Sequence, residues 1–146
     1  MPDINYNRPD RLRQYVSIYK HQFHAAGSWA KWLNVNLEKE IFDHGDYGNF
    51  VHSIPANAEL INSAAWLDDN GNIWSFQSDF SVIGTQKEQF GYFEDPKNVV
   101  NPWHGFPVIP FSKSRYAISE SLLQRWVIEG LIDQDDIPSI LTKKKI

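Results

Sequence analysis

Histidines and carboxylates gather in the segment FDHGDYGNFVH, residues 42 to 52, which contains Asp43, His44, Asp46 and His52. Imidazole and carboxylate groups this close together can bind a divalent metal, or can form a general base with the partner that orients it. The same residue types collect at helix C-termini as capping loops, although an aspartate there meets the unfavourable end of the helix dipole. Two interpretations therefore stay open, a capping loop and a hydrolytic site.

The segment NPWHGFPVIP, residues 101 to 110, is the second candidate. Trp103 and Phe106 flank His104 and Gly105, and a rigid turn there could hold the imidazole at a defined angle, as a general base requires. No serine or threonine adjoins His104, so an acidic partner would come from elsewhere in the chain. The enzyme hypothesis is a hydrolase or nuclease that combines His104 with the four residues of the first cluster. The alternatives are a structural brace and a binding surface.

Other sequence signatures do not indicate a catalytic or metal-binding site. His21 and His24 stand three residues apart in a predicted helix, but no acidic residue supplies a third ligand on that face, so we expect an ordinary solvated face. The chain has no cysteine, which excludes disulfides, thiolate zinc sites and cysteine nucleophiles. Phosphate-binding glycine loops, nucleophile elbows and HExxH motifs are also absent from the sequence. We therefore predict no metal and no cofactor.

The negative charge of the chain is concentrated in its middle. Residues 41 to 110 carry nine Asp and Glu against two Lys and Arg, and twelve aromatic residues, whereas the net charge of the whole chain is -4. Direct binding of DNA or RNA is not expected, because that requires a basic stripe among the aromatic residues. An acidic, aromatic surface instead suits a basic protein, because complementary charge speeds encounter and aromatic anchors dominate binding energy.

We accordingly predict a small cytoplasmic binding protein, an inhibitor of the immunity or antitoxin type that occludes a basic partner protein such as a nuclease toxin. The competing hypotheses are the enzyme described above, a subunit of a larger assembly, and acids scattered over an ordinary surface. The expected partner-binding residues are Trp66, Asp68, Asp69, Trp74, Asp79, Trp103, His104 and Phe106.

Two helices are expected in the first 45 residues. The apolar residues Leu12, Tyr15, Val16, Tyr19 and Phe23 follow helical spacing and predict a helix from residue 9 to the glycine at residue 27. A second helix is predicted to start with the serine at residue 28 as N-cap and to end before the glycine at residue 45, so that the two form a helical hairpin.

After residue 50 the pattern changes to strands. The segment LINSAAWLDDNGNIWSFQSDFSVIG predicts two strands joined by the turn DDNG, and EQFGYFE predicts a third. The segment GFPVIPF should lie at a sheet edge or outside the hydrogen-bonded ladder, because Pro107 and Pro110 lack an amide donor. Helical spacing returns after Ser119 with Leu122, Leu123 and Trp126, and a short helix or turn should follow near Pro138.

Together these elements predict one α+β domain over residues 1 to 146, with an N-terminal helical hairpin, a central antiparallel sheet and C-terminal helices packed on the sheet. The N-terminal residues lack the apolar core of a secretory signal, and no stretch approaches the roughly 20 apolar residues of a membrane-spanning helix. We therefore expect a cytoplasmic protein without a membrane partner.

Overall fold

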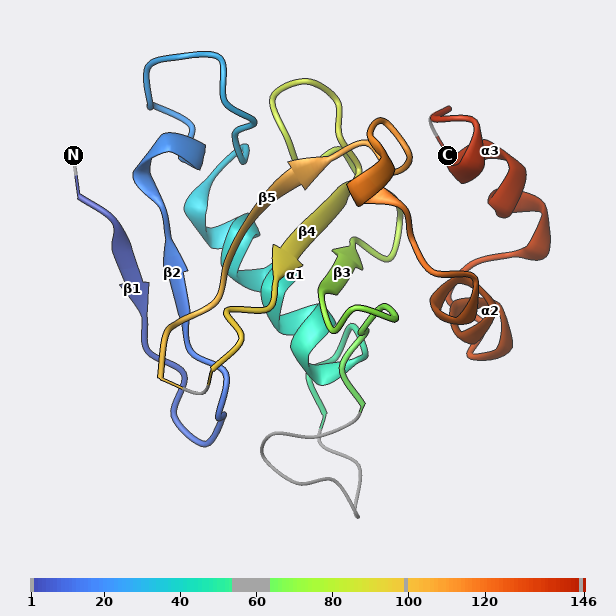
Figure 1. The fold of residues 1–146 in the computed structure, drawn as a ribbon, viewed down its shortest axis with the longest axis horizontal. Coiled ribbons are helices and arrows are strands. Elements are labelled where there is room, and N and C mark those ends of the chain that lie inside the picture. Colours follow the sequence, from blue (N-terminus) through green and yellow to red (C-terminus); the bar gives the residue numbers. More distant parts are fainter. Residues whose placement is uncertain (1, 54–63, 99, 145) are drawn as a thin grey trace.

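A computed structural model describes residues 2–53, 64–98, 100–144 and 146. These residues form a mixed α+β structure with two small antiparallel sheets and three α-helices (Figure 1). The strands are β1 (Ile4–Tyr6), β2 (Tyr15–Ser17), β3 (Ile73–Phe76), β4 (Phe90–Glu94) and β5 (His104–Val108). The α-helices are α1 (Val35–Tyr47), α2 (Glu120–Ile128) and α3 (Ile137–Leu141), and the 3-10 helices are η1 (Tyr19–His21), η2 (Ser114–Tyr116) and η3 (Gln134–Asp136).

The predicted N-terminal helical hairpin is wrong, because β1 and β2 form a β-hairpin where the first helix was expected. All three residues of β2 are buried, so this strand has no solvent-facing side that a period of two would reveal. Between the strands the chain turns through Asp10, whose φ is 67°, and the side-chain amide of Gln14 closes the loop by donating to the carbonyls of Arg8 and Arg11. The side chains of Arg8 and Arg11 in this loop are buried.

Helix α1 starts later and ends later than predicted. Its N-cap is Asn34, whose side chain accepts a hydrogen bond from the amide of Leu37, and its C-cap is Gly48 in the left-handed conformation. Gly45 lies inside the helix, where a Cβ atom would come within 2.5 Å of Ile73 Cγ2. The glycine therefore permits close approach between α1 and β3, and does not end the helix.

The larger sheet has the strand order β3-β4-β5, and all its pairs are antiparallel. Strand β5 is a terminal strand of this sheet, as its prolines predicted. The β1-β2 hairpin lies beside it, because Tyr15 and Trp103 form a parallel bridge and the Val16 amide donates to the Trp103 carbonyl at 2.9 Å (Figure 1). A strand was also expected before the DDNG turn. In the described residues only an isolated bridge between Leu67 and Ile73 is found there, and residues 60–63 of the expected strand lie outside the described part.

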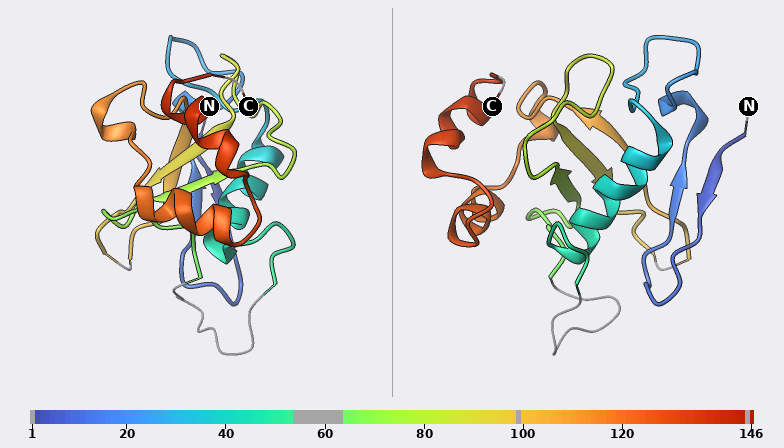
Figure 2. Two further views of the ribbon diagram at one scale, coloured as in Figure 1. Left: turned by 90° about the vertical axis from the view of Figure 1, so that its right-hand side faces the viewer. Right: turned by 180° about the vertical axis from the view of Figure 1, so that it is seen from behind.

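Buried side chains cover both faces of this sheet. Helix α1 packs on one face, where Ile41, Phe42 and Phe93 belong to one core cluster. On the other face Trp126 of α2 packs against Phe76 with ring centroids 4.9 Å apart. The predicted C-terminal helix after Ser119 is confirmed, and so is the short helix with a proline in its first turn. Helices α2 and α3 lie beyond β3, and α1 lies behind the sheet (Figures 1 and 2).

Candidate functional site

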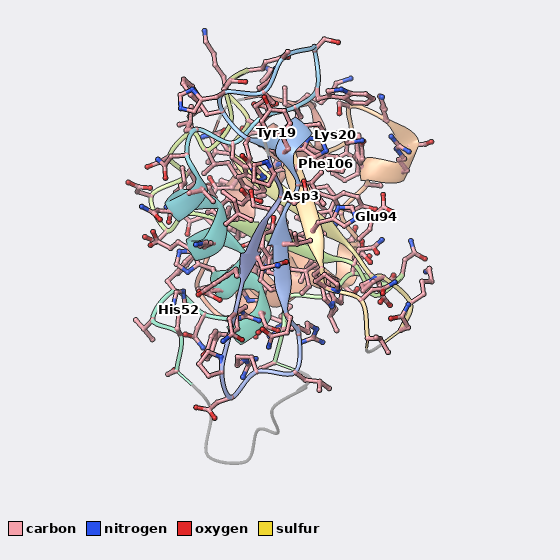
Figure 3. All side chains as sticks on the ribbon, turned by 90° about the vertical axis from the view of Figure 1, so that its left-hand side faces the viewer. Asp3, Tyr19, Lys20, His52, Glu94 and Phe106 are labelled. Atoms are coloured by element: carbon pink, nitrogen blue, oxygen red, sulfur yellow. The ribbon has the colours of Figure 1, made fainter. Side chains whose placement is uncertain are left out.

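The residues of the predicted enzyme site do not come together. His104 lies opposite Glu94, the last residue of β4, whereas His44 contacts Gln77, which follows β3 beside the first residue of β4. These two places lie at opposite ends of a five-residue strand, about 13 Å apart at the usual rise per residue. Figure 3 likewise shows His52 well apart from Phe106 on β5. The expected combination of His104 with the first cluster therefore does not form.

Asp43 and Asp46 are bound by three arginines of the β1-β2 loop. The Arg8 Nη2 atom lies 2.7 Å from Asp43 Oδ1 and 2.6 Å from Asp46 Oδ2, and Arg11 Nε and Arg13 Nη1 each lie 2.8 Å from an Asp46 oxygen. Burial acts to raise the pKa of Asp46, but the charge of Arg8 and the hydrogen bonds from Arg11 and Arg13 outweigh it and hold that pKa below its usual value. Both carboxylates are thus used to attach the N-terminal hairpin to α1.

His44 and His52 do form a pair. His44 Nδ1 and His52 Nε2 lie 2.8 Å apart, and His44 Nε2 lies 3.1 Å from Gln77 Oε1. Because a carbonyl oxygen only accepts, a neutral His44 donates from Nε2 to Gln77 and accepts from His52 at Nδ1. Burial lowers the pKa of His44 and favours this neutral form. Across the described ranges, no three His, Asp or Glu side chains are grouped so as to hold a metal ion.

Glu38 is a buried carboxyl group that sequence reasoning missed, because a single glutamate on an amphipathic helix carries no signal of its own. It accepts hydrogen bonds from the Tyr15 hydroxyl at 2.6 Å and the Ser17 hydroxyl at 2.7 Å. Burial raises its pKa to about 7, against the opposing effect of these two hydrogen bonds. The group joins α1 to β2 and is the carboxyl most ready to take up a proton near neutral pH.

Half of the expected partner-binding residues are inside the protein. Trp66 and Trp74 are fully buried, and Trp103 is 8% exposed. Asp68 is also buried, and it accepts a hydrogen bond from the indole nitrogen of Trp74 at 3.1 Å. These four residues therefore build the core and the β3 turn, and leave little or no surface for a partner. Those that remain at least partly exposed are Asp69, Asp79, His104 and Phe106.

An acidic surface is present, but at α2, η3 and the adjoining turn. Asp69 is attached to α2, since its amide donates to Ser119 Oγ at 2.8 Å and its carboxylate accepts from Ser121 Oγ at 2.7 Å. The cation of α2, Arg125, is held by the carbonyls of Ala64 and Ala65 and by Glu129. We call this surface the α2 face, and its acids are Asp69, Glu120, Glu129, Asp133, Asp135 and Asp136.

A large apolar side chain lies on the same surface. Leu122, Leu123 and Trp126 occupy the inner side of α2, and the helical repeat places Ile128 on its outer side. Ile128 is 83% exposed and precedes Glu129 directly. Leu141 of α3 is also exposed. The α2 face therefore combines apolar contact area with negative charge.

A groove runs along β5 on another part of the surface. It has a volume of about 460 Å³ and is lined by three aromatic residues, Trp29, Phe106 and Tyr116. Its charged and titratable lining residues are Lys20, His21, Glu88, Glu94, Lys113 and Arg115. We call it the β5 groove, and Figure 3 shows Lys20 and Phe106 close together on this side of the molecule.

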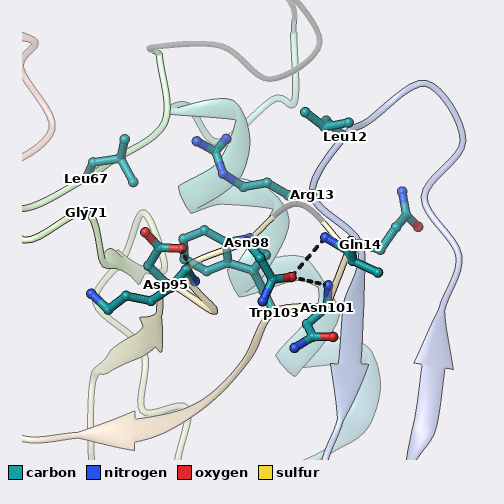
Figure 4. Close-up of a pocket in the computed structure, with 11 residues that line it drawn as sticks. Leu12, Arg13, Gln14, Leu67, Gly71, Asp95, Asn98, Asn101 and Trp103 are labelled. Carbon is teal, nitrogen blue, oxygen red and sulfur yellow. Dashed lines mark hydrogen bonds between the residues drawn. The ribbon is translucent and has the colours of Figure 1, made fainter.

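A second hollow of about 540 Å³ lies next to Trp103 (Figure 4). The side chains of Asn98, Asp95 and Arg13, which line it, already have partners within the protein. Asn98 Oδ1 accepts from the amides of Val100 and Asn101, Asp95 Oδ1 accepts from the amide of Lys97, and Arg13 binds Asp46. These groups shape the loop before β5, and the hollow presents fewer free charges than the β5 groove.

Comparison with protein-family models, with curated proteins and with solved structures found no match to the chain. In the part of the chain that the structure describes, no helix is long and apolar enough to cross a membrane. We therefore infer function from the surfaces that the chain itself presents.

Proposed function

We propose that the protein binds a basic partner protein through the α2 face and acts by occluding that partner, as an inhibitor of the immunity or antitoxin type does. The observation that supports this most strongly is Ile128, a large apolar residue 83% exposed on a helix whose other exposed neighbours are mainly acidic or polar. An apolar anchor with charged groups around it is the usual organisation of a binding hot spot.

Among the described residues, Glu129 is the one acid of the α2 face in an ion pair, and the other five keep their charge for a partner. Arg125 is occupied by backbone carbonyls and by Glu129, so it offsets little of the remaining negative charge. Acids on an exposed rim attract a basic protein over about 8–10 Å at physiological salt, which raises the association rate. The apolar anchor then slows dissociation. A cationic surface that normally grips nucleic acid would be a suitable target.

This surface differs from the one that the charge count of residues 41 to 110 suggested. Within that segment Asp43, Asp46, Asp68 and Glu88 are buried, so their charges do not form an exterior patch. Asp69 is the member of the expected set that the α2 face retains. The partner class is unchanged, while its contact surface moves to the C-terminal helices.

Affinity capture of the wild-type chain followed by mass spectrometry should recover a basic protein. The double variant Glu120→Lys with Asp135→Lys should bind that protein at least tenfold more weakly at low salt, mainly through a slower association rate. A matched control, Glu40→Lys with Glu94→Lys, changes the net charge equally at exposed positions outside the α2 face. Equal loss in both double variants would show that net charge, and not this surface, governs binding.

The anchor is tested separately with Ile128→Asn, which leaves the net charge unchanged and removes apolar area. We expect faster dissociation with a nearly unchanged association rate. If the captured partner is a nuclease, the wild-type chain should also inhibit its cleavage of nucleic acid at a one-to-one ratio. A captured partner that stays fully active in the complex would contradict occlusion.

A further inference from the structure

The β5 groove is the second surface on which side-chain chemistry points to a ligand. Its volume of about 460 Å³ lies within the range of about 300–1,000 Å³ that is usual for small-molecule sites. Trp29, which is 54% exposed, and Phe106 both line it, so flat apolar area is available to an occupant. These residues come from segments far apart in the sequence, which meet because the chain after η1 passes alongside β5.

Three cations of the groove lack an acidic partner. The Lys20 ammonium lies 4.2 Å from the centroid of the Trp29 ring, and the Arg115 guanidinium lies 5.0 Å from the centroid of the Tyr116 ring. Lys113 lies near the same tyrosine. None of the three forms an ion pair within the described residues. An anion bound in the groove would therefore meet cations that have no competing carboxylate contact.

His21 adds a hydrogen-bond acceptor to the groove. It is only 6% exposed, and its Nδ1 lies 2.6 Å from the Ala30 carbonyl oxygen. A carbonyl only accepts, so Nδ1 carries the proton and a neutral ring leaves Nε2 as an acceptor. Burial lowers the pKa of His21, which keeps the ring neutral near pH 7. No described residue hydrogen-bonds to Nε2, although the ring lines the groove and stacks on Phe106 with centroids 4.9 Å apart.

A ligand that satisfies all these groups needs a flat ring, an N–H donor and a negative charge. We propose that the β5 groove binds a nucleotide, with its base against Trp29 and Phe106, a base N–H donating to His21 Nε2, and its phosphate held by Lys113 and Arg115. Glu94, which also lines the groove, can accept from an exocyclic amino group of the base. The proposal is independent of the partner protein, because it uses neither the α2 face nor its acids.

The two parts of the ligand make separate contributions. Inorganic phosphate would meet the cations but would leave the aromatic lining and His21 unused. A nucleoside would use the rings but would leave Lys113 and Arg115 without an anion. Each fragment should therefore bind more weakly than the intact nucleotide, because charge-assisted contacts and ring stacking both contribute to affinity.

The test uses the full chain in titration calorimetry at pH 7.5 with AMP, GMP, CMP and UMP as probes, and with adenosine and inorganic phosphate as fragments. We expect at least one monophosphate to bind with a Kd below 1 mM, and both fragments to bind at least tenfold more weakly. No binding by any monophosphate up to 10 mM would overturn the proposal. Equal affinity for inorganic phosphate would also overturn it, because the ring would then make no contribution.

Variants locate the site. Lys113→Gln with Arg115→Gln should weaken monophosphate binding at least tenfold, whereas the control pair Lys39→Gln with Lys97→Gln, which removes the same charge outside the groove, should not. Trp29→Ala should also weaken binding, and its exposure allows the fold to persist, which circular dichroism would verify. Equal effects of the two charge pairs would place the nucleotide outside the groove. A single-stranded oligonucleotide that binds more than a hundredfold more tightly than any monophosphate would replace the proposed ligand with a nucleic acid strand.

Discussion

Arg8 and Asp46 form a buried ion pair, in which Nη2 and Oδ2 lie 2.6 Å apart and neither side chain is more than 2% exposed. The pair connects the loop between β1 and β2 to the last turn of α1. Asp46 is shared with Arg11 and Arg13, so one carboxylate balances several guanidinium groups. A carboxylate engaged in this way is a structural element, and it fixes the position of the N-terminal hairpin.

Replacement of Asp46 should therefore destabilise the protein strongly. In Asp46→Ala the three arginines keep their charge in a buried site while their shared counter-ion is lost, and breaking a buried pair in this way costs about 3–5 kcal/mol. Urea unfolding at pH 7 measures the change. As a control, Asp135→Ala removes an exposed carboxylate and should change the free energy of unfolding by less than about 0.5 kcal/mol. Similar values for the two variants would contradict a structural role for the network.

Glu38→Gln should stabilise the protein increasingly as the pH rises. The pKa of Glu38 is raised from 4.5 to about 7 in the folded state, so the folded protein holds a proton that the unfolded chain has released between these values. The free energy of unfolding of the wild type therefore falls as pH rises through that window, by roughly 3 kcal/mol from this group. Glutamine does not titrate. Urea unfolding of both proteins at pH 5, 6, 7 and 8 should show a difference in the free energy of unfolding that widens as the pH rises, and a constant difference would contradict the raised pKa of Glu38.

His44 should have the opposite pH dependence. Its pKa is lowered by burial, so below the ordinary value near 6.5 the unfolded chain binds a proton that the folded protein resists. The contribution of a neutral His44 to stability is complete above pH 6.5 and decreases as the pH falls. His44→Gln should therefore lose less stability than the wild type between pH 7 and pH 5. Parallel curves for His44→Gln and the wild type would count against the buried pair.

Alanine substitutions at two glycines should distinguish the stability cost of backbone strain from that of steric overlap. Gly48 and Gly130 have nearly the same φ, 74° and 75°. A Cβ atom on Gly48 would lie 1.8 Å from the carbonyl oxygen of Ala64, whereas one on Gly130 meets nothing within 4 Å. Gly130→Ala should cost about 1–2 kcal/mol, the usual penalty of this conformation. Gly48→Ala should cost at least about 2 kcal/mol more, and equal melting temperatures for the two variants would contradict the close contact.

The C-terminal half of the fold was the more predictable half. The apolar repeat of Leu122, Leu123 and Trp126 located α2, because amphipathic spacing is a local signal. Pro107 located a terminal strand for a similar reason, since a missing amide is a property of one residue. Each of these features is encoded within a few neighbouring positions.

The N-terminal hairpin could not be derived in the same way. The apolar residues from Leu12 to Tyr19 satisfy helical spacing, but the arginines before and within this stretch bind Asp43 and Asp46, more than thirty residues away. Such tertiary pairing overrides a weak local preference and leaves no trace in the local pattern. The fully buried β2 also lacks the alternation that normally reveals a strand.

The distribution of charge along the sequence did not predict the charged surface of the folded protein, for a related reason. A count along the chain does not distinguish Asp68, which accepts from an indole in the core, from Asp69, which is exposed next to α2. The β5 groove was equally hidden, because Trp29, Phe106 and Tyr116 are separated by up to 87 positions. Only the path of the folded chain brings them together.

The bridge between Tyr15 and Trp103 affects how the chain can fold while it is being synthesised. Strand β2 leaves the ribosome long before residue 103 has been synthesised. Its backbone groups therefore lack their final hydrogen-bond partners during that time. During that interval the nascent hairpin presents an open strand edge, which is prone to pair with other chains. Slow translation before residue 103 should therefore favour aggregation, and early capture of the hairpin by α1 through the arginine loop should oppose it.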